Sequence, residues 1–383
     1  MTKGQLKVLM LTTYADYGGP FPKLAPLLIR GLRDAGANVD VLGWSAHTSG
    51  AEPLLAKILG RSADLVRVLR CVRHRRPDVI YVATSHTWHS LLRDSSLALA
   101  VTRRGPPIVL HMHGSACERL GQPGQNLFTL FSTQLARRAA VVLLLSTEEL
   151  APWRRLCPEV HFEVVVNPFV PVARVEPSEV APPDRSRTPA LLTVARLIPE
   201  KGLFELVEAL EVVAHSRQCR LVIAGTGPAG HELMQRVREL RLSDSVELVG
   251  YLVGQQLDAA YRSADVFVLP SHSEGFPLSV MEAMGYGLPV ITTRIRGCAD
   301  HLVPDVHALF VPPRDPAALG AAIVRLLDDY ELRERMGRNN LQKVADFAPE
   351  VVMPRYAQIL EAAVAGGKKG THASAESPGS ELA

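Results

Sequence analysis

The chain has 383 residues, of which 47% are hydrophobic and 21% are charged. These proportions are typical of a soluble globular protein with two or three domains, and no stretch is long and apolar enough for a membrane span. The first residues, MTKGQLKVLMLTT, are too short and polar an opening for a signal peptide. Five scattered cysteines lack metal-ligand spacing and indicate reduced thiols, so we expect a cytoplasmic protein.

Charge is distributed unevenly along the chain. Residues 1–175 contain 21 Lys and Arg against 12 Asp and Glu, whereas residues 176–365 contain 19 against 25. A basic first half suits an anionic partner such as a phospholipid surface or a phosphorylated acceptor, or it is simply a solvated basic face. The helix predicted at 54–76 concentrates this charge, and either lies on anionic lipid or packs its apolar side on a sheet.

Short apolar runs alternate with helical patterns through the first half of the chain. The predicted strands are 6–11, 39–42, 78–83, 107–111 and 140–145, and the predicted helices are 22–36, 54–76, 91–103 and 128–139. Strands that alternate with helices indicate an α/β domain with a parallel sheet. The stretch 171–189 is rich in proline and charge, which is typical of a linker.

Two loops of this half follow predicted strands directly. Gly18 and Gly19 follow the first strand, and a glycine pair allows a backbone to approach a phosphate closely. His113 follows the fourth strand, where it suits a sugar hydroxyl, half of a metal site with His111, or a structural turn. The polar stretch 85–90 is interpreted as a loop with surface histidines at 86 and 89.

A second α/β pattern begins at residue 190. The strand 190–194 leads to Arg196 and Lys201, and the strand 220–224 leads to Gly225 and Gly227 within a G-x-G-x-x-G run. This run matches the dinucleotide fingerprint and gives an NAD-dependent oxidoreductase as an alternative. Against that alternative, Pro228 stiffens the turn and no acidic residue stands at the end of the next strand.

The stretch 264–293 reads as a strand, a loop, a short helix and a second strand. Such a unit opens its loop at the carboxyl edge of a parallel sheet, where ligands bind. Glu274 lies in the loop and Glu282 in the helix. Carboxylates suit hydroxyl groups, and the free N–H groups of the helix start suit an anion.

The segment SHSEGFPLSVMEAMGYGLPVITT, with Glu274 and Glu282, resembles the E-x7-E signature of retaining glycosyltransferases with the GT-B fold. This group includes sucrose synthases and bacterial glycogen synthases. The segment VARLIPEKG, with Arg196 and Lys201, resembles the R-x4-K pair of the same group. The resemblance implies two Rossmann-like domains that face each other across a cleft.

The implied domains are an acceptor domain at 1–175, a linker at 176–189 and a donor domain at 190–348. A helix at 349–365 is expected to cross back to the first domain, and residues 366–383 are expected to form a disordered tail. The chain departs from the family at Pro168, where an Asn-Gly turn is usual. It also departs at Arg296 and Asp300, which replace a glycine and a glutamate.

The resemblance also implies site residues. Arg196 and Lys201 would stabilise the leaving diphosphate, and with Glu274 and His113 they form the expected catalytic set. Glu282 would accept hydrogen bonds from ribose hydroxyls. The expected donor-binding residues are Gly18, Gly19, Gly225, Gly227, Gly275, Phe276, Pro277, Leu278 and Glu282. No metal or cofactor is expected, since cationic side chains replace a divalent ion.

The implied reaction transfers a sugar from a nucleotide-diphosphate sugar to a hydroxyl of a glycan, lipid-linked or small-molecule acceptor, with retention of configuration. No nucleic acid partner is expected. Peripheral contact with an anionic membrane through the basic first half stays open as an alternative to a solvated basic face. A sugar phosphorylase or a sugar-nucleotide epimerase on the same fold stays an alternative, as does a catalytically silent sugar- or lipid-binding relative.

Overall fold

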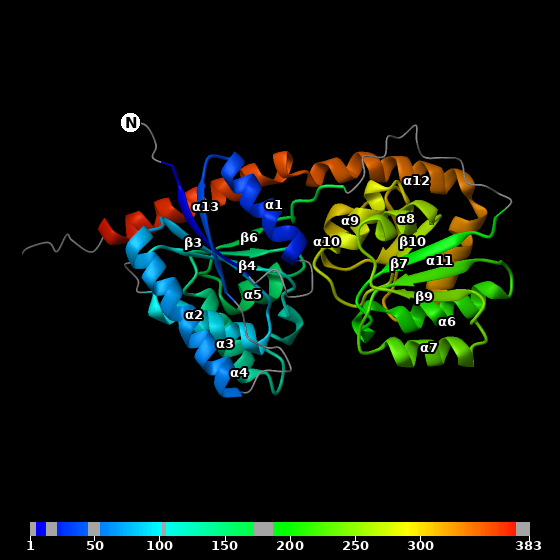
Figure 1. Ribbon diagram of the computed structural model, residues 1–383, viewed down its shortest axis with the longest axis horizontal. Coiled ribbons are helices and arrows are strands. Elements are labelled where there is room, and N and C mark those ends of the chain that lie inside the picture. The colour runs from blue at the N-terminus through cyan, green and yellow to red at the C-terminus, as the bar shows by residue number, and fades with distance from the viewer. Residues whose placement is uncertain (1–4, 13–20, 45–53, 102–104, 172–186, 373–383) are drawn as a thin grey trace, which may run out of the picture. The chain divides into compact units, whose positions relative to one another are not determined.

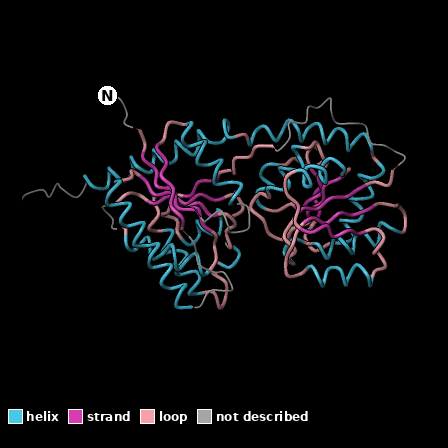
Figure 2. The backbone as a smooth tube through the Cα atoms, in the orientation of Figure 1, coloured by secondary structure: helices cyan, strands magenta, loops and turns pink. Residues whose placement is uncertain are grey.

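The computed structural model describes residues 5–12, 21–44, 54–101, 105–171 and 187–372. The chain forms two compact units, residues 1–168 with 349–383 and residues 169–348. In both units a parallel sheet is flanked by helices (Figures 1 and 2). The predicted α/β class with two parallel-sheet domains is therefore confirmed.

The first unit contains a six-stranded parallel sheet in the order β2-β1-β3-β4-β5-β6. Its strands are β1 (Lys7–Thr12), β2 (Asn38–Gly43), β3 (Val79–Thr84), β4 (Ile108–Met112), β5 (Val141–Leu144) and β6 (Phe162–Val164). Its helices are α1 (Phe21–Asp34), α2 (Leu54–Arg75), α3 (Trp88–Ala100), α4 (Asn126–Ala136), α5 (Leu150–Leu156) and α13 (Pro349–His372).

Both faces of this sheet are buried, because successive side chains of a strand point to opposite sides. Leu9 and Leu11 belong to the core beneath α2 to α5, whereas Val8 and Met10 belong to the core beneath α1 and α13. A side chain at Gly31 of α1 would overlap Met353 of α13, so the two helices pack closely. The chain's last helix thus completes the first unit.

The second unit contains a six-stranded parallel sheet in the order β12-β11-β10-β7-β8-β9. Its strands are β7 (Ala190–Val194), β8 (Arg220–Ala224), β9 (Val246–Gly250), β10 (Val266–Leu269), β11 (Val290–Thr293) and β12 (Ala308–Val311). Its helices are α6 (Leu203–Ala214), α7 (Gly230–Glu239), α8 (Gln255–Ser263), α9 (Leu278–Gly285), α10 (Arg296–His301), α11 (Pro316–Asp328) and α12 (Tyr330–Lys343).

Three predicted boundaries differ from the structure. Helix α3 begins at Trp88, within the predicted loop 85–90, because the Thr87 hydroxyl accepts the Ser90 N–H and caps the first turn. No element is predicted for 295–302, where the structure has the short helix α10, whose six residues are too few to show a period. Helix α13 continues to His372, beyond the predicted end at 365, since each added residue of a formed helix gains a backbone hydrogen bond.

The chain passes from the first unit to the second between Pro168 and Phe169, before the predicted boundary at 175. Residues 172–186 of the predicted linker and 373–383 of the predicted tail lie outside the described residues. Among the helices that the structure describes, none combines the length and hydropathy needed to cross a bilayer.

Candidate functional site

The expected donor residues of the second unit lie at the carboxyl ends of neighbouring strands. Strands β10, β7 and β8 are adjacent and parallel, so the loops that follow them meet at one edge of the sheet. The loop after β7 carries Arg196 and Lys201, the loop after β8 carries Gly225 and Gly227, and the loop after β10 carries Glu274.

Backbone hydrogen bonds join these loops to one another. Leu197 donates its N–H to the Thr226 carbonyl and accepts the N–H of Ala229, both at 3.0 Å. His272 donates to the Glu200 carbonyl at 2.8 Å, and Gly297, in α10 after β11, donates to the Gly275 carbonyl at 2.8 Å. The loops of four strands therefore form a fixed frame around the charged side chains.

The glycines of the loop after β8 make this frame possible. Gly225 has φ +150°, and a side chain there would overlap the Ala195 carbonyl oxygen. A side chain at Gly227 would overlap the backbone of Leu197. Because only glycine permits such close backbone approach, the G-x-G pattern is explained by the packing of two loops. Contact of these glycines with a donor stays a prediction.

Lys201 and Glu274 form an ion pair between the loops after β7 and β10. Their side chains are 17% and 20% exposed, so the pair lies at the surface of the frame and is accessible from outside. Burial and the neighbouring charge of Arg196 lower the pKa of Lys201 to about 8, and the charge of the Glu200 carboxylate opposes that shift. The Arg196 side chain is exposed. Two cations and two carboxylates, those of Glu200 and Glu274, thus lie close together at this edge.

Glu282 lies on α9, and its side chain is only 5% exposed. Its Oε2 atom accepts a hydrogen bond from the Tyr261 hydroxyl of α8 at 2.8 Å. The first turn of α9 follows Gly275, Phe276 and Pro277, and Pro277 is its N-cap.

The Phe276 ring is buried and packs on the rings of His301 and Phe347, with centroids 5.1 and 5.2 Å away. A ring held this way contributes to the core, so only the backbone of Phe276 is suited to a ligand.

His113 lies in the first unit, directly after β4. Its N–H donates to the Thr84 carbonyl at 2.8 Å, and its ring centroid is 3.8 Å from that of His111. Burial lowers the pKa of His113 to about 3, so the imidazole is neutral at physiological pH. The Tyr81 hydroxyl is hydrogen-bonded to Nδ1 of His111. Within the described ranges, no third His, Cys, Asp or Glu joins the two histidines to form a metal-binding group.

The interpretation of His86 as a surface residue is wrong. The side chain is 3% exposed, its Nε2 lies 2.8 Å from the Ser132 hydroxyl, and its Nδ1 accepts the Ala116 N–H at 3.0 Å. Its ring stacks on Trp153. Its position close to the end of β3 is similar to that of His113 directly after β4, and this was the available signal. His89 is exposed, as expected.

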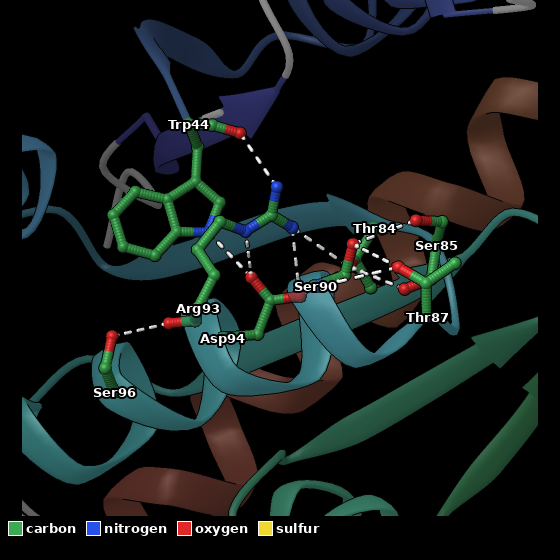
Figure 3. A network of polar contacts seen from close by, with 8 residues as sticks. All are labelled: Trp44, Thr84, Ser85, Thr87, Ser90, Arg93, Asp94 and Ser96. Carbon is green, nitrogen blue, oxygen red and sulfur yellow. Dashed lines mark hydrogen bonds and ion pairs between the residues drawn. The ribbon is translucent and has the colours of Figure 1, made fainter. Parts of the chain in front are cut away.

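A buried polar network at the ends of β2 and β3 was not anticipated from sequence (Figure 3). Arg93 and Asp94 of α3 form an ion pair with side chains 3% and 1% exposed. Trp44 donates its indole N–H to Asp94 at 2.7 Å, and Arg93 donates to the Trp44 carbonyl and the Thr84 hydroxyl, both at 3.0 Å. Thr84 also donates to Asp94.

Glu149 is a second buried carboxylate of this unit that sequence reasoning missed. Its side chain is fully buried and accepts the N–H groups of Leu145 at 3.0 Å and Ser115 at 3.2 Å. The expected phosphate contacts of Gly18 and Gly19 lie outside the described residues.

Comparison with known sequences identifies the family. Residues 178–343 match the family described as Glycosyl transferases group 1, and residues 6–168 match the Glycosyl transferase 4-like domain. The chain belongs to the group 1 glycosyltransferases. Glycogen synthase of Mycobacterium tuberculosis is 35% identical to this group 1 member over 181 residues, which are 47% of this chain and 44% of that protein. The chain spans less than half the length of the first curated relatives it matches.

Solved structures share the fold over nearly the whole chain. Sucrose-phosphate synthase from Thermosynechococcus elongatus has a TM-score of 0.75 at 22% identity, covering 94% of this chain and 100% of that one. Anabaena HepE in complex with UDP-glucose has a TM-score of 0.72 at 19% identity, covering 94% and 100%. The fold of this family member is therefore GT-B, as predicted. The family match favours a glycosyltransferase over the NAD-dependent oxidoreductase that the Gly225 motif suggested.

Proposed function

We propose that this group 1 glycosyltransferase is a retaining enzyme that transfers a sugar from a nucleotide-diphosphate sugar to a hydroxyl acceptor. The observation that carries the proposal is the accessible Lys201–Glu274 pair with Arg196 beside it, at the carboxyl edge of β7 and β10. A pyrophosphate requires placed cations, and a sugar offers hydroxyls to a carboxylate. The HepE complexes with UDP and with UDP-glucose support this donor class.

In the proposed reaction the acceptor oxygen attacks the anomeric carbon while the bond to the donor phosphate oxygen breaks. The departing phosphate oxygen takes the acceptor's proton, and attack from the same face retains the configuration. Lys201 and Arg196 stabilise the charge that develops on the diphosphate, and because they are already in place, little reorganisation is needed. Glu274 exchanges part of its pairing with Lys201 for hydroxyls of the transferred sugar.

The remaining predicted residues hold the substrates in this proposal. Glu282 accepts hydrogen bonds from the ribose, and the amides from Gly275 to Leu278 face sugar and phosphate oxygens. The acceptor binds to the first unit, where His113 is a neutral hydrogen-bonding group because its pKa is about 3. No metal enters the scheme, since the two cations carry the electrostatic role.

A panel of nucleotide sugars tests the proposal. UDP-, GDP- and ADP-linked hexoses, together with NAD, are tested for protection of the protein against thermal unfolding. We expect at least one nucleotide sugar to raise the melting temperature and NAD to leave it unchanged, because a ligand stabilises the state that it binds. Protection by NAD alone would reject the proposal.

Product analysis separates the transferase from its alternatives. With a protective nucleotide sugar and a panel of glycan, lipid-linked and small-molecule acceptors, we expect release of nucleoside diphosphate that depends on the acceptor. An isomerised nucleotide sugar without an acceptor would indicate an epimerase. A dependence on inorganic phosphate would indicate a phosphorylase.

The second part of the proposal is peripheral contact of α2 with an anionic membrane. Arg67, Arg70 and Arg73 are exposed on this helix, as are Leu59 (61%) and Val66 (45%), whereas Val68 is buried against the core. A helix face with exposed apolar side chains among arginines suits anionic headgroups.

The membrane contact is tested by sedimentation with vesicles of phosphatidylcholine, with and without phosphatidylglycerol. We expect binding only to the anionic vesicles, reduced by Arg70→Glu/Arg73→Glu and by high salt. Arg220→Glu/Arg238→Glu, at exposed positions of the second unit, is the matched control and should bind like the wild type. Equal binding by both double variants would reject the contact through α2.

A further inference from the structure

Glu282 accepts a hydrogen bond from a helix outside the E-x7-E segment. Tyr261, on α8, is 1% exposed, and its hydroxyl lies 2.8 Å from Oε2 of Glu282. The two residues are 21 positions apart, and their helices α8 and α9 come directly before and directly after β10 in the chain. A buried carboxylate needs such a donor, and a hydrogen bond to an ionised group is stronger than a neutral one.

The Tyr261 ring is itself held in place. It stacks on the ring of Tyr286 with centroids 5.0 Å apart and planes at 8°, and it also packs on Phe267. The Tyr286 hydroxyl donates to Asp258 at 2.7 Å and therefore points to a different partner. Burial, followed by the charge of Glu282, raises the pKa of Tyr261 well above its usual value, so the phenol stays a donor. A rigid donor of this kind leaves the carboxylate little freedom to rotate.

We propose that Tyr261 is a positioning residue that orients the Glu282 carboxylate toward the ribose hydroxyls of the nucleotide. This inference rests on the proposed function, which places the ribose at Glu282. A glutamate that is already ordered loses less conformational entropy when it binds ligand, so preorganisation raises affinity for the group that it contacts. The gain is specific, because only a nucleotide with ribose hydroxyls can use the oriented carboxylate.

A purely structural role of the same hydrogen bond predicts a different result. If the Tyr261 hydroxyl only satisfied a buried charge, its loss would lower stability and weaken all nucleotides to a similar degree. A positioning role predicts instead that binding of ribose-containing nucleotides weakens selectively. The ratio of affinities for nucleotides with and without ribose hydroxyls therefore distinguishes the two roles.

The experiment measures binding by calorimetry of UDP, GDP and ADP and of their 2′,3′-dideoxy analogues. We expect the wild type to bind the preferred ribonucleotide about tenfold or more tightly than its analogue, as for a lost charge-assisted hydrogen bond. In Tyr261→Phe, which keeps the ring, we expect ribonucleotide affinity to fall about fivefold and analogue affinity to change less than about twofold.

Tyr286→Phe is the matched control, since it removes a hydroxyl from the neighbouring ring that binds Asp258 and not Glu282. This variant should keep the wild-type ratio of ribonucleotide affinity to analogue affinity. If Tyr261→Phe kept the wild-type ratio of ribonucleotide to analogue affinity, the inference would be overturned and the proposed function would stand. The same holds if the wild type binds ribonucleotides and their dideoxy analogues equally well. A wild type that binds none of the six nucleotides would overturn the proposed function itself.

A double-variant comparison covers the case in which Tyr261→Phe does not fold. Tyr261→Phe/Glu282→Gln removes the buried charge that the single variant deprives of the Tyr261 hydroxyl, so it should fold. If Tyr261 acts through Glu282, this double variant binds the ribonucleotide as Glu282→Gln alone does. A further loss of about fivefold on top of Glu282→Gln would show an independent role and overturn the inference.

Discussion

In both units, loops follow the carboxyl ends of the sheet strands, but the ion pairs at these ends differ in how deeply they are buried. In the second unit, Lys201 and Glu274 pair at the frame's surface, with side chains 17% and 20% exposed. In the first unit, Arg93 and Asp94 pair beneath the surface, with side chains 3% and 1% exposed, and Trp44 and Thr84 complete their hydrogen bonds (Figure 3). One edge leaves its ion pair partly exposed, and the other buries its ion pair to hold its own strands.

The difference follows from what surrounds each pair. The loops of the second unit are joined by backbone hydrogen bonds, so the frame does not depend on the side chains of Lys201 and Glu274. The ends of β2 and β3 are instead joined by the side chains of α3, so removing one of them disrupts the edge. We therefore expect substitutions in the first pair to affect stability and substitutions in the second to affect activity.

The largest expected effect is on stability, for Asp94→Ala. The variant leaves the Arg93 guanidinium buried without its carboxylate and removes the acceptor of Trp44 and Thr84. We expect the free energy of unfolding to fall by about 3–5 kcal/mol, measured by urea denaturation.

Glu159→Ala is the control for this measurement, because it removes one partner of an exposed pair with Arg137. It should lower the free energy of unfolding far less than Asp94→Ala does. If Asp94→Ala cost no more than the control, the buried network would not be what holds the first edge together.

The next effect is on activity, for Lys201→Ala. We expect kcat/KM to fall about 100-fold or more, because in the proposed mechanism a cation that stabilises the leaving diphosphate is lost. The melting temperature should change little, since the side chain pairs with a partly exposed glutamate and not with the core. Arg217→Ala, in the exposed pair with Asp328, is the matched control and should keep full activity. Near-normal turnover in Lys201→Ala would remove this residue from the mechanism.

The pH dependence of nucleotide binding tests separately whether the charge of Lys201 acts on a ligand or on stability. With a pKa of about 8, Lys201 loses its proton as pH rises through that value, so affinity for a nucleoside diphosphate should be constant below pH 8. At pH 9 it should be about tenfold weaker. Stability changes in the opposite direction, because the pKa is lowered from 10.5 in the folded state and the folded protein gains stability from this group between pH 8 and 10.5.

Calorimetric titration with UDP, GDP and ADP at pH 7 to 9.5 measures this dependence. Lys201→Arg is the control, because its guanidinium stays charged throughout the range and its affinity should not fall. An equal decline in wild type and Lys201→Arg would assign the titration to another group.

The smallest expected effect is that of His113→Gln. Because the pKa of His113 is about 3, the imidazole is uncharged between pH 5 and 8 and acts as a neutral hydrogen-bonding group. A neutral amide should keep activity within about tenfold, and the wild-type pH profile should show no inflection from His113 in that range. An inflection near pH 6.5 that the variant abolishes would contradict this assignment.

The sequence predicted the fold and the charged residues of the second unit because their signals are local. The strands at 190–194 and 220–224 agree with β7 and β8 to the residue. Each motif follows a strand, and the parallel order of the strands brings Lys201 and Glu274 to one edge. A buried strand followed by a polar loop is visible in a single window of sequence, and so is a motif within it.

Only the tertiary structure decided which polar groups are buried and what they pair with. Trp44 and Asp94 are 50 positions apart, and Tyr261 and Glu282 are 21 apart, so neither pair is visible in any one segment. His86 resembles a loop histidine in sequence and becomes buried because α4 and α5 supply Ser132 and Trp153 around it. Local sequence patterns therefore predicted the positions of the candidate site residues along the chain. The packing of distant segments determined the environment of each side chain, and hence its pKa and orientation.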